Sequence, residues 1–134
     1  MKNSIFIFLL LFISCNTLTT TQTQPEKIGE YSANREHWAE IKVNKKYGFI
    51  DYNGVVVVKP IYDYIGKYGA NREHWAEVRI GKKIGFIDYT GKEIVQAIYD
   101  FIGEYSANRE HWAEARIGNK LGFINYEGNF IEIK

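Results

Sequence analysis

The chain of 134 residues contains one cysteine and two prolines, and neither sign of charge dominates, because 17 Lys and Arg face 16 Asp and Glu. A single cysteine excludes an intrachain disulfide framework and a zinc site built from several cysteines. Balanced charge excludes a basic arm as the main feature, so no nucleic-acid partner is expected. Aromatic residues make up 16% of the chain, which argues against intrinsic disorder. The composition therefore predicts a folded domain or a short array of repeats.

Long hydrophobic runs are also missing. Residues 5–13 form a stretch of nine apolar residues, which is too short to cross a bilayer core of about 20 residues. This stretch follows Lys2 and precedes the small residue Ser14. A basic start, a short apolar run and a small residue are the pattern of a secretory signal peptide, which we expect at residues 1–14.

The only cysteine, Cys15, directly follows this segment. Residues 12–15 read Phe-Ile-Ser-Cys and resemble the lipobox of bacterial lipoproteins, although Phe12 stands where that family prefers Leu. The resemblance implies cleavage before Cys15 and lipidation of its thiol and new amino terminus. Two or more acyl chains hold a protein stably on a membrane. The lipid on Cys15 would therefore anchor the chain to an inner or outer membrane of the cell envelope. The alternative is an ordinary signal peptide and a secreted protein.

Residues 16–24 carry no charge and no periodic pattern, which predicts a flexible tether. We therefore divide the chain into a signal peptide (1–14), an anchor cysteine with its tether (15–27) and a repeat region (28–134).

The repeat region is one sequence written three times. Ala-Asn-Arg-Glu-His-Trp-Ala-Glu recurs with a period of 37 residues, as the positions of Trp38, Trp75 and Trp112 show. The copies span residues 28–64, 65–101 and 102–134, and the first two are identical at 23 of 37 positions.

Each copy has the apolar alternation of β-strands and no helical period. In the first copy we expect strands at 38–43, 47–52 and 55–59, with a short fourth strand at 61–64. The Asn53-Gly54 pair predicts a two-residue hairpin with positive φ at both positions. Pro60 lacks a donor and should end the third strand.

These strands predict an all-β fold of three tandem antiparallel β-meander repeats of 37 residues, with about nine strands in an open curved or rolled sheet. A β-solenoid is the alternative, and the hairpin turns argue against it. A closed propeller is not expected, because propellers usually take about four to eight blades.

Residues 45–54 read Lys-Lys-Tyr-Gly-Phe-Ile-Asp-Tyr-Asn-Gly and are followed by a β run, Pro60 and Tyr62-Asp63. This string resembles the bacterial WG-repeat family, also called KWG repeats, whose units have a Gly-Lys-Trp-Gly core. The family Trp is replaced here by Tyr47 and its copies Ile84 and Leu121. The resemblance implies β-rich repeats, often in envelope or secreted proteins, and supplies no catalytic residues.

Three His-Glu pairs recur with the repeat, but equivalent residues in three-stranded units would lie about 14 Å apart. Zinc ligands lie near 2.1 Å, so a shared metal site is not expected. No third group stands at a spacing that would orient a histidine for nucleophilic catalysis, so no enzyme activity and no cofactor are expected.

Two interpretations of the repeated string remain open. In the first, its residues are structural and Trp38 packs where units join. In the second, Arg, His and Trp form an exposed interaction ladder, because such residues anchor interfaces. The candidate ladder consists of Arg35, His37, Trp38, Arg72, His74, Trp75, Arg109, His111 and Trp112.

The sequence thus favours a non-catalytic, lipid-anchored envelope protein whose repeats act as an interaction module. The partner would be an envelope protein or a polysaccharide, since a repeated weak site suits a repetitive ligand. A carbohydrate or small-ligand binding module on the same scaffold is the alternative.

Overall fold

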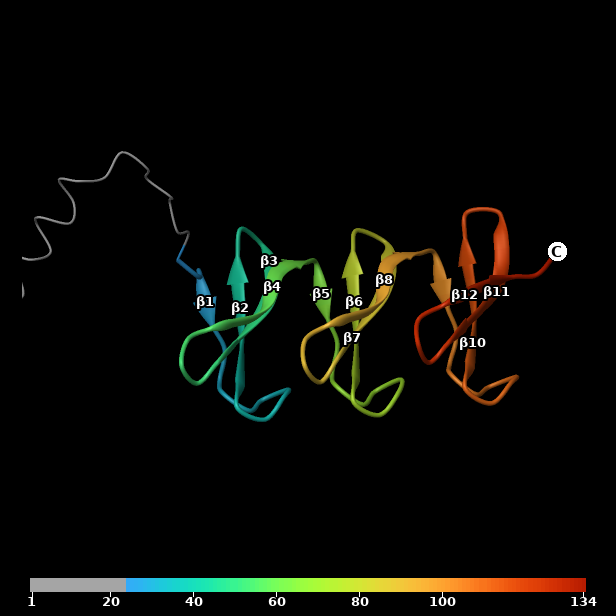
Figure 1. Ribbon diagram of the computed structural model, residues 1–134. Helices are drawn as coiled ribbons and strands as arrows, with labels where there is room; N and C mark the ends of the chain where they lie inside the picture. Colours follow the sequence, from blue (N-terminus) through green and yellow to red (C-terminus); the bar gives the residue numbers. More distant parts are fainter. Residues whose placement is uncertain (1–23) are drawn as a thin grey trace, which may run out of the picture.

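The structure, a computed structural model, describes residues 24–134, which form β-strands and the turns between them. The strands make three antiparallel sheets of four strands each, and the sheets follow one another in a row (Figure 1). We call each sheet with its loops a unit. The predicted fold class of tandem antiparallel β-meander repeats is confirmed, with twelve strands in place of nine.

Within each unit the strands pair in chain order. Unit 1 contains β1 (Lys27–Ile28), β2 (Trp38–Val43), β3 (Lys46–Asp51) and β4 (Val56–Tyr62). Unit 2 contains β5 (Tyr64–Ile65), β6 (Trp75–Ile80), β7 (Lys83–Asp88) and β8 (Glu93–Tyr99). Unit 3 contains β9 (Phe101–Ile102), β10 (Trp112–Ile117), β11 (Lys120–Asn125) and β12 (Phe130–Glu132). Across residues 24–134, no helix is long and apolar enough to cross a membrane.

The first hairpin of each unit follows the prediction closely. β2, β6 and β10 have the expected bounds, because their strict alternation separates two faces. β2 pairs with β3 without interruption from Trp38↔Asp51 to Val43↔Lys46. The turn between them consists of Asn44 and a lysine with φ of 50° and 66°, as a two-residue type I′ turn requires.

The second hairpin of unit 1 differs from the prediction. Of the Asn53-Gly54 pair only Gly54 has a positive φ, 77°. The Gly54 N–H donates to the Asp51 carbonyl (2.9 Å), and the Asp51 N–H donates to the Val55 carbonyl (2.9 Å), which makes a three-residue loop with a G1 bulge. Asp51 Oδ1 accepts the N–H groups of Asn53 and Val55 at 2.9 and 3.0 Å. The expected two-residue turn is therefore wrong, because the aspartate side chain fixes a different one.

The prediction that Pro60 ends a strand is also wrong, because β4 continues through it to Tyr62. β4 is an edge strand, paired with β3 alone. Its register jumps from Phe49↔Val58 to Tyr47↔Tyr62, which leaves a bulge around Pro60. An edge position and a bulge both tolerate a residue without an N–H group.

A glycine inside β3 makes room for this bulge. A Cβ atom on Gly48 would lie 2.3 Å from the Val58 carbonyl oxygen and 2.8 Å from the Pro60 nitrogen. Gly85 holds the same place in β7, where a Cβ would lie 2.4 Å from the Val95 carbonyl oxygen. Close approach of the backbone therefore requires glycine at this position.

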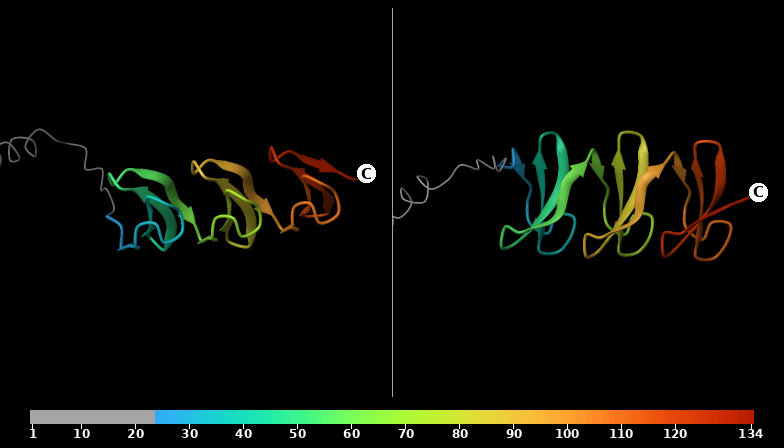
Figure 2. Two further views of the ribbon diagram at one scale, coloured as in Figure 1. Left: turned by 90° about the horizontal axis from the view of Figure 1, so that it is seen from below. Right: turned by 45° about the horizontal axis from the view of Figure 1, so that its top comes forward.

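The segment after β4 opens the next unit. We expected residues 61–64 to form a fourth strand of the first repeat. Instead Tyr64 and Ile65 form β5, which pairs with β6 of unit 2. A short connection therefore crosses each junction (Figure 2). By the strand bounds, the sheet changes at Asp63 and Asp100.

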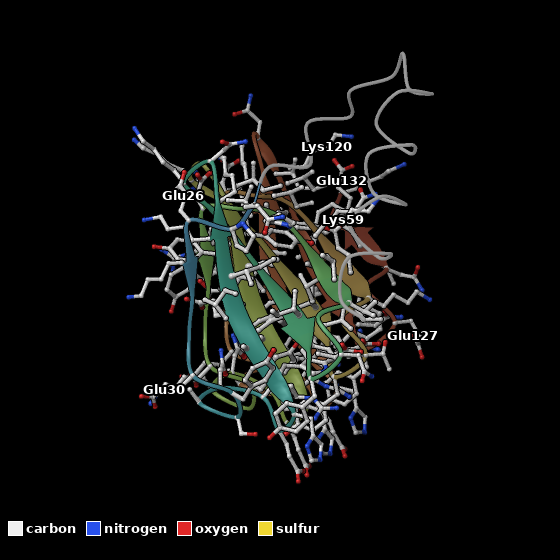
Figure 3. All side chains as sticks on the ribbon, turned by 90° about the vertical axis from the view of Figure 1, so that its left-hand side faces the viewer. Glu26, Glu30, Lys59, Lys120, Glu127 and Glu132 are labelled. Atoms are coloured by element: carbon white, nitrogen blue, oxygen red, sulfur yellow. The ribbon has the colours of Figure 1, made fainter. Side chains whose placement is uncertain are left out.

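Two apolar clusters lie at the junctions between units, and a smaller one, formed by Ala39, Ile41 and Ile50, lies in unit 1. Seen along the row, the sheets stand one behind another (Figure 3). At the first junction the buried residues are Trp38, Phe49, Val58 and Tyr62 of unit 1 with Ile65, Ala76, Val78, Ile87 and Ala97 of unit 2. At the second they are Trp75, Phe86, Val95 and Tyr99 with Ile102, Tyr105, Ala113, Ala115 and Ile124. Neighbouring units thus bury each other's apolar faces, as a repeat array requires.

Candidate functional site

The repeated Ala-Asn-Arg-Glu-His-Trp-Ala-Glu string forms a tight loop that leads into β2, β6 and β10. In unit 1 the Trp38 N–H donates to the Arg35 carbonyl at 3.0 Å, and the His37 N–H donates to Ser32 Oγ at 3.0 Å. His37 has a φ of 67°, and His74 and His111 have the same value. The loop geometry is therefore repeated in all three units.

The tryptophans of this loop lie mostly inside the protein. Trp38 and Trp75 are 9% and 5% exposed, and Trp112 at the end of the row is half-buried. Trp38 packs against Phe49 of its own unit and Tyr68 of the next, with ring centroids 5.7 and 6.2 Å apart. The predicted exposed ladder is therefore wrong for Trp38 and Trp75, because the following unit covers them.

The arginines of the candidate ladder connect neighbouring units. The Arg35 guanidinium lies 4.9 Å from the centre of the Trp38 ring and 4.6 Å from that of Tyr89 in unit 2. Its Nε–H also donates to the Tyr89 carbonyl at 3.2 Å. Arg72 lies 3.6 Å from the Tyr126 ring of unit 3. Such cation–π contacts contribute about 0.5–2 kcal/mol each, so these arginines stabilise the junctions.

Asn34 is a junction residue that the sequence analysis left without a role. Its Nδ2 donates to the Gly66 carbonyl at 3.0 Å, and its Oδ1 accepts the Tyr68 N–H at 3.0 Å. Both partners belong to unit 2. The repetition of Asn beside Arg in all three copies indicates that this asparagine has a role. Sequence spacing alone does not show that its side chain binds the next unit.

The Tyr-Asp pair at the end of unit 1, which recurs at the end of unit 2, also binds across the junction. Asp63 Oδ1 lies 2.5 Å from Lys46 Nζ, and Asp63 Oδ2 accepts the Gly81 N–H at 2.6 Å. The Gly81 N–H and the Lys46 ammonium hold the pKa of Asp63 below its usual range. The preceding Tyr62 donates from its hydroxyl to Glu93 Oε2 of unit 2 at 3.1 Å.

The histidines remain at the surface. The side chains of His37, His74 and His111 are 62%, 56% and 60% exposed. Each Nε2 lies 3.2–3.3 Å from the preceding glutamate, and each ring packs edge-on against a tyrosine, with centroids 4.4–5.2 Å apart. We call these sets the Glu-His-Tyr clusters: Glu36, His37 and Tyr52; Glu73, His74 and Tyr89; Glu110, His111 and Tyr126.

The clusters do not combine into a metal site. Over residues 24–134, no group of three or more His, Cys, Asp or Glu side chains is placed to hold a metal ion. Cys15, predicted as the lipid attachment site, lies outside the described residues, as does the predicted signal peptide.

A hollow of about 350 Å³ opens beside the middle cluster, at the second junction. It is lined by Asn71, Arg72, Glu73, His74, Tyr105 and Tyr126. Asn71 Oδ1 and Arg72 Nε are buried and have no hydrogen-bond partner among the described residues. The hollow therefore lies beside one buried acceptor and one buried donor that are unpaired among the described residues.

The comparisons with known proteins agree with this architecture. The model of the WG containing repeat family matches residues 47–83 and 84–120. No curated protein and no solved structure matches the chain. Each family match starts in the second long strand of one unit, β3 or β7, and ends at the first residue of the second long strand of the next, β7 or β11. Each match therefore includes the connection between two units. These matches cover more than half of the chain, which belongs to the WG containing repeat family.

Proposed function

We propose that this protein is a non-catalytic, lipid-anchored envelope protein whose three units act together as an interaction module. The threefold repetition of the exposed Glu-His-Tyr clusters carries this proposal. Each histidine has a left-handed backbone conformation, which costs an L-residue about 1–2 kcal/mol and costs glycine nothing. Strain at a repeated exposed position is expected where the side chain serves recognition.

Three equal sites in a row suit a partner that is itself repetitive. Each cluster offers an imidazole, a carboxylate and an aromatic ring, which suffices for a weak polar and stacking contact. Weak contacts made together raise the overall affinity through effective concentration. An envelope polymer or a protein assembly with a regular repeat meets this condition.

The test replaces all three histidines together. Asn tolerates positive φ, so the variant His37→Asn/His74→Asn/His111→Asn keeps the loop and removes the imidazoles. Crosslinking in the native envelope and purification of the tagged chain should recover a specific partner with the wild type and at least about tenfold less with the variant. The matched control is Lys45→Asn/Lys82→Asn, at the exposed turns of the first hairpins. Equal recovery with all three proteins would contradict the proposal.

The anchor part of the proposal rests on residues 1–15. A signal-peptide pattern followed by the single cysteine supports attachment through Cys15. Cys15→Ala should abolish incorporation of labelled fatty acid and move the chain out of the membrane fraction. Cys15→Ser is the closer steric control and should behave in the same way. Labelling that persists in both variants would refute lipidation at Cys15.

A carbohydrate or small-ligand binding module is the second candidate. The hollow at the second junction favours it, because Asn71 Oδ1 and Arg72 Nε lack partners and Tyr105 and Tyr126 supply aromatic walls. A hydroxyl group could donate to the asparagine oxygen and accept from the arginine nitrogen.

Calorimetric titration of the full chain with soluble glycans tests this candidate. Saturable binding that Asn71→Ala weakens, and that the equivalent Asn108→Ala leaves unchanged, would support the hollow as the site. Binding that is absent, or that both variants weaken equally, would oppose it.

A further inference from the structure

The two junctions share an apolar contact pattern and an arginine that lies over a tyrosine of the next unit, so every unit carries two different faces. The forward face contacts the following unit and presents the Asn-Arg pair, the tryptophan and the phenylalanine that follows glycine in β3, β7 or β11. The rear face contacts the preceding unit and presents the isoleucine of the short first strand and the tyrosines that receive the asparagine and the arginine. A heterologous contact of this kind can be repeated without limit.

The forward face of unit 3 is open. Phe49 and Phe86 are fully buried at the two junctions, whereas the equivalent Phe123 is half-buried. Around it, Leu121, Ile131 and Ile133 are more than half exposed. A groove of about 220 Å³ runs across this face, and it is lined mainly by apolar side chains. Contiguous exposed apolar surface of this kind marks an interaction site.

The rear face of unit 1 is open at its rim, whereas its centre, formed by Ala39, Ile41 and Ile50, is buried. Ile65 and Ile102 are 8% and 9% exposed, whereas the equivalent Ile28 is 52% exposed. Tyr31 is 39% exposed, whereas the equivalent Tyr105 is 9% exposed. The described residues of one chain therefore display an open forward face on unit 3 and the exposed rim of a rear face on unit 1.

The polar residues of the open forward face also lack the partners that they have at the junctions. Arg35 and Arg72 each lie over a tyrosine of the next unit, whereas Arg109 contacts Trp112 of its own unit. The equivalent tyrosine on the rear face of unit 1 is Tyr52, which is 58% exposed. Asn108 turns back to Glu114 of its own unit, with Nδ2 2.8 Å from Oε1.

The end of unit 3 keeps an apolar residue at the centre of this face. At the junctions Phe49 and Phe86 pair with valines of β4 and β8. β12 pairs with β11 without the bulge, so Phe123 faces Ile131. Glu132 lies beside Lys120 at 3.5 Å, so its charge is paired at the edge (Figure 3).

From these observations we infer that the forward face of unit 3 binds the rear face of unit 1 of a second copy of this chain, head to tail. Arg109 then lies over Tyr52 of that copy, and Leu121 and Phe123 are covered by Ile28 and Tyr31. Because the contact is heterologous and continues the translation between units, it extends into open filaments and does not close into dimers.

Site-directed crosslinking tests the contact. The full chain with Cys15→Ala has no cysteine, so one tagged copy receives Arg109→Cys and a differently tagged copy receives Tyr52→Cys. A short bis-maleimide should join the two tags in the mixture. Arg109→Cys mixed with Lys45→Cys, which lies at the turn between β2 and β3 of unit 1, should stay uncrosslinked. Equal crosslinking in both mixtures, or none in either, would overturn the inference.

Sedimentation velocity of the full chain in detergent supplies a measurement without cysteines. The wild type should show a series of species that grows with concentration. Leu121→Glu places a charge in the groove and should raise the concentration needed for association at least about tenfold. Ile98→Glu is the matched control, because Ile98 is an exposed strand residue of unit 2, 43% exposed, away from both end faces. A wild type that remains a single monomeric species, or a loss that is equal for both variants, would contradict head-to-tail association.

Discussion

The glycine in the second long strand of unit 2 gives the most direct test of the fold. In Gly85→Ala the added Cβ would lie 2.4 Å from the Val95 carbonyl oxygen, 2.6 Å from the Ala97 nitrogen and 2.7 Å from the Gln96 carbonyl carbon. Ordinary contacts of this type begin near 3.4 Å, so β7 and β8 must separate by about 1 Å at the bulge. All three of these atoms belong to the backbone, so none of them is part of a flexible side chain that could turn away.

The separation would open the second junction, because Phe86 and Val95 are buried there. Overpacking of a well-packed site costs about 1–3 kcal/mol, and a clash with backbone belongs at or above the upper end. A loss of about 3 kcal/mol lowers the Tm of a domain of this size by about 12 °C. Near-ultraviolet circular dichroism during heating would follow the loss through the signal of the buried tryptophans.

Gly54→Ala is the matched control. Gly54 has a φ of 77° and open space around its Cβ position, so alanine there should cost about 1 kcal/mol from backbone strain alone. If Gly85→Ala were no more destabilising than Gly54→Ala, close backbone approach would not be the reason for glycine in this strand.

Two further predictions concern the junctions. Trp75→Ala should lower the free energy of unfolding by about 3–5 kcal/mol, and Trp112→Ala by about 1–2 kcal/mol, because the first ring is buried and the second half-buried. Urea titrations at low protein concentration measure both losses, and equal losses would contradict this prediction. The Lys83 ammonium and the Gly118 N–H hold the pKa of Asp100 below its ordinary value of 3.8, so its ionised form stabilises the fold above that pH and the contribution disappears as pH falls through the lowered pKa. Asp100→Asn should therefore be less stable than the wild type at pH 7, and it should lose less stability between about pH 4 and 2. Acid unfolding of the two proteins tests this, and parallel stability curves for the variant and the wild type would refute the role of the ion pair.

The parts of the fold that follow from local pattern were predictable. The strand at Trp38–Val43 has the expected bounds because alternation of side chains settles both its type and its two faces. The chain as a whole was readable as a β-array because the period of 37 residues is unbroken.

The errors came from side chains and geometry that act between elements. The Asp51 carboxylate accepts two backbone N–H groups and selects a three-residue loop where Asn-Gly alone favours a two-residue turn. Pro60 sits in a bulge whose existence depends on the glycine across the strand pair, and no short sequence window contains both.

The residues of the candidate ladder differ in exposure, and the sequence of one repeat does not show which of them the next unit covers. Trp38 is buried and Arg35 is a junction residue because unit 2 covers them, and the alternation in one repeat does not reveal the position of its neighbour. The histidine of the same loop stays at the surface, because its left-handed φ turns the chain just before the strand begins. The predicted exposed row of His37, His74 and His111 is therefore present, with tyrosines beside it in place of tryptophans.

The period of 37 residues has a consequence for changes in length. Because the units repeat with this period, excision of residues 65–101 would bring Trp38 against Ile102 and Tyr105, which occupy the places of Ile65 and Tyr68. The shortened protein would keep one junction of the same kind and would lose one junction and one Glu-His-Tyr cluster. Duplication of the same segment would add one junction and one cluster. The number of Glu-His-Tyr clusters can thus change by whole units, and each added or removed unit brings or takes one junction of the same apolar type.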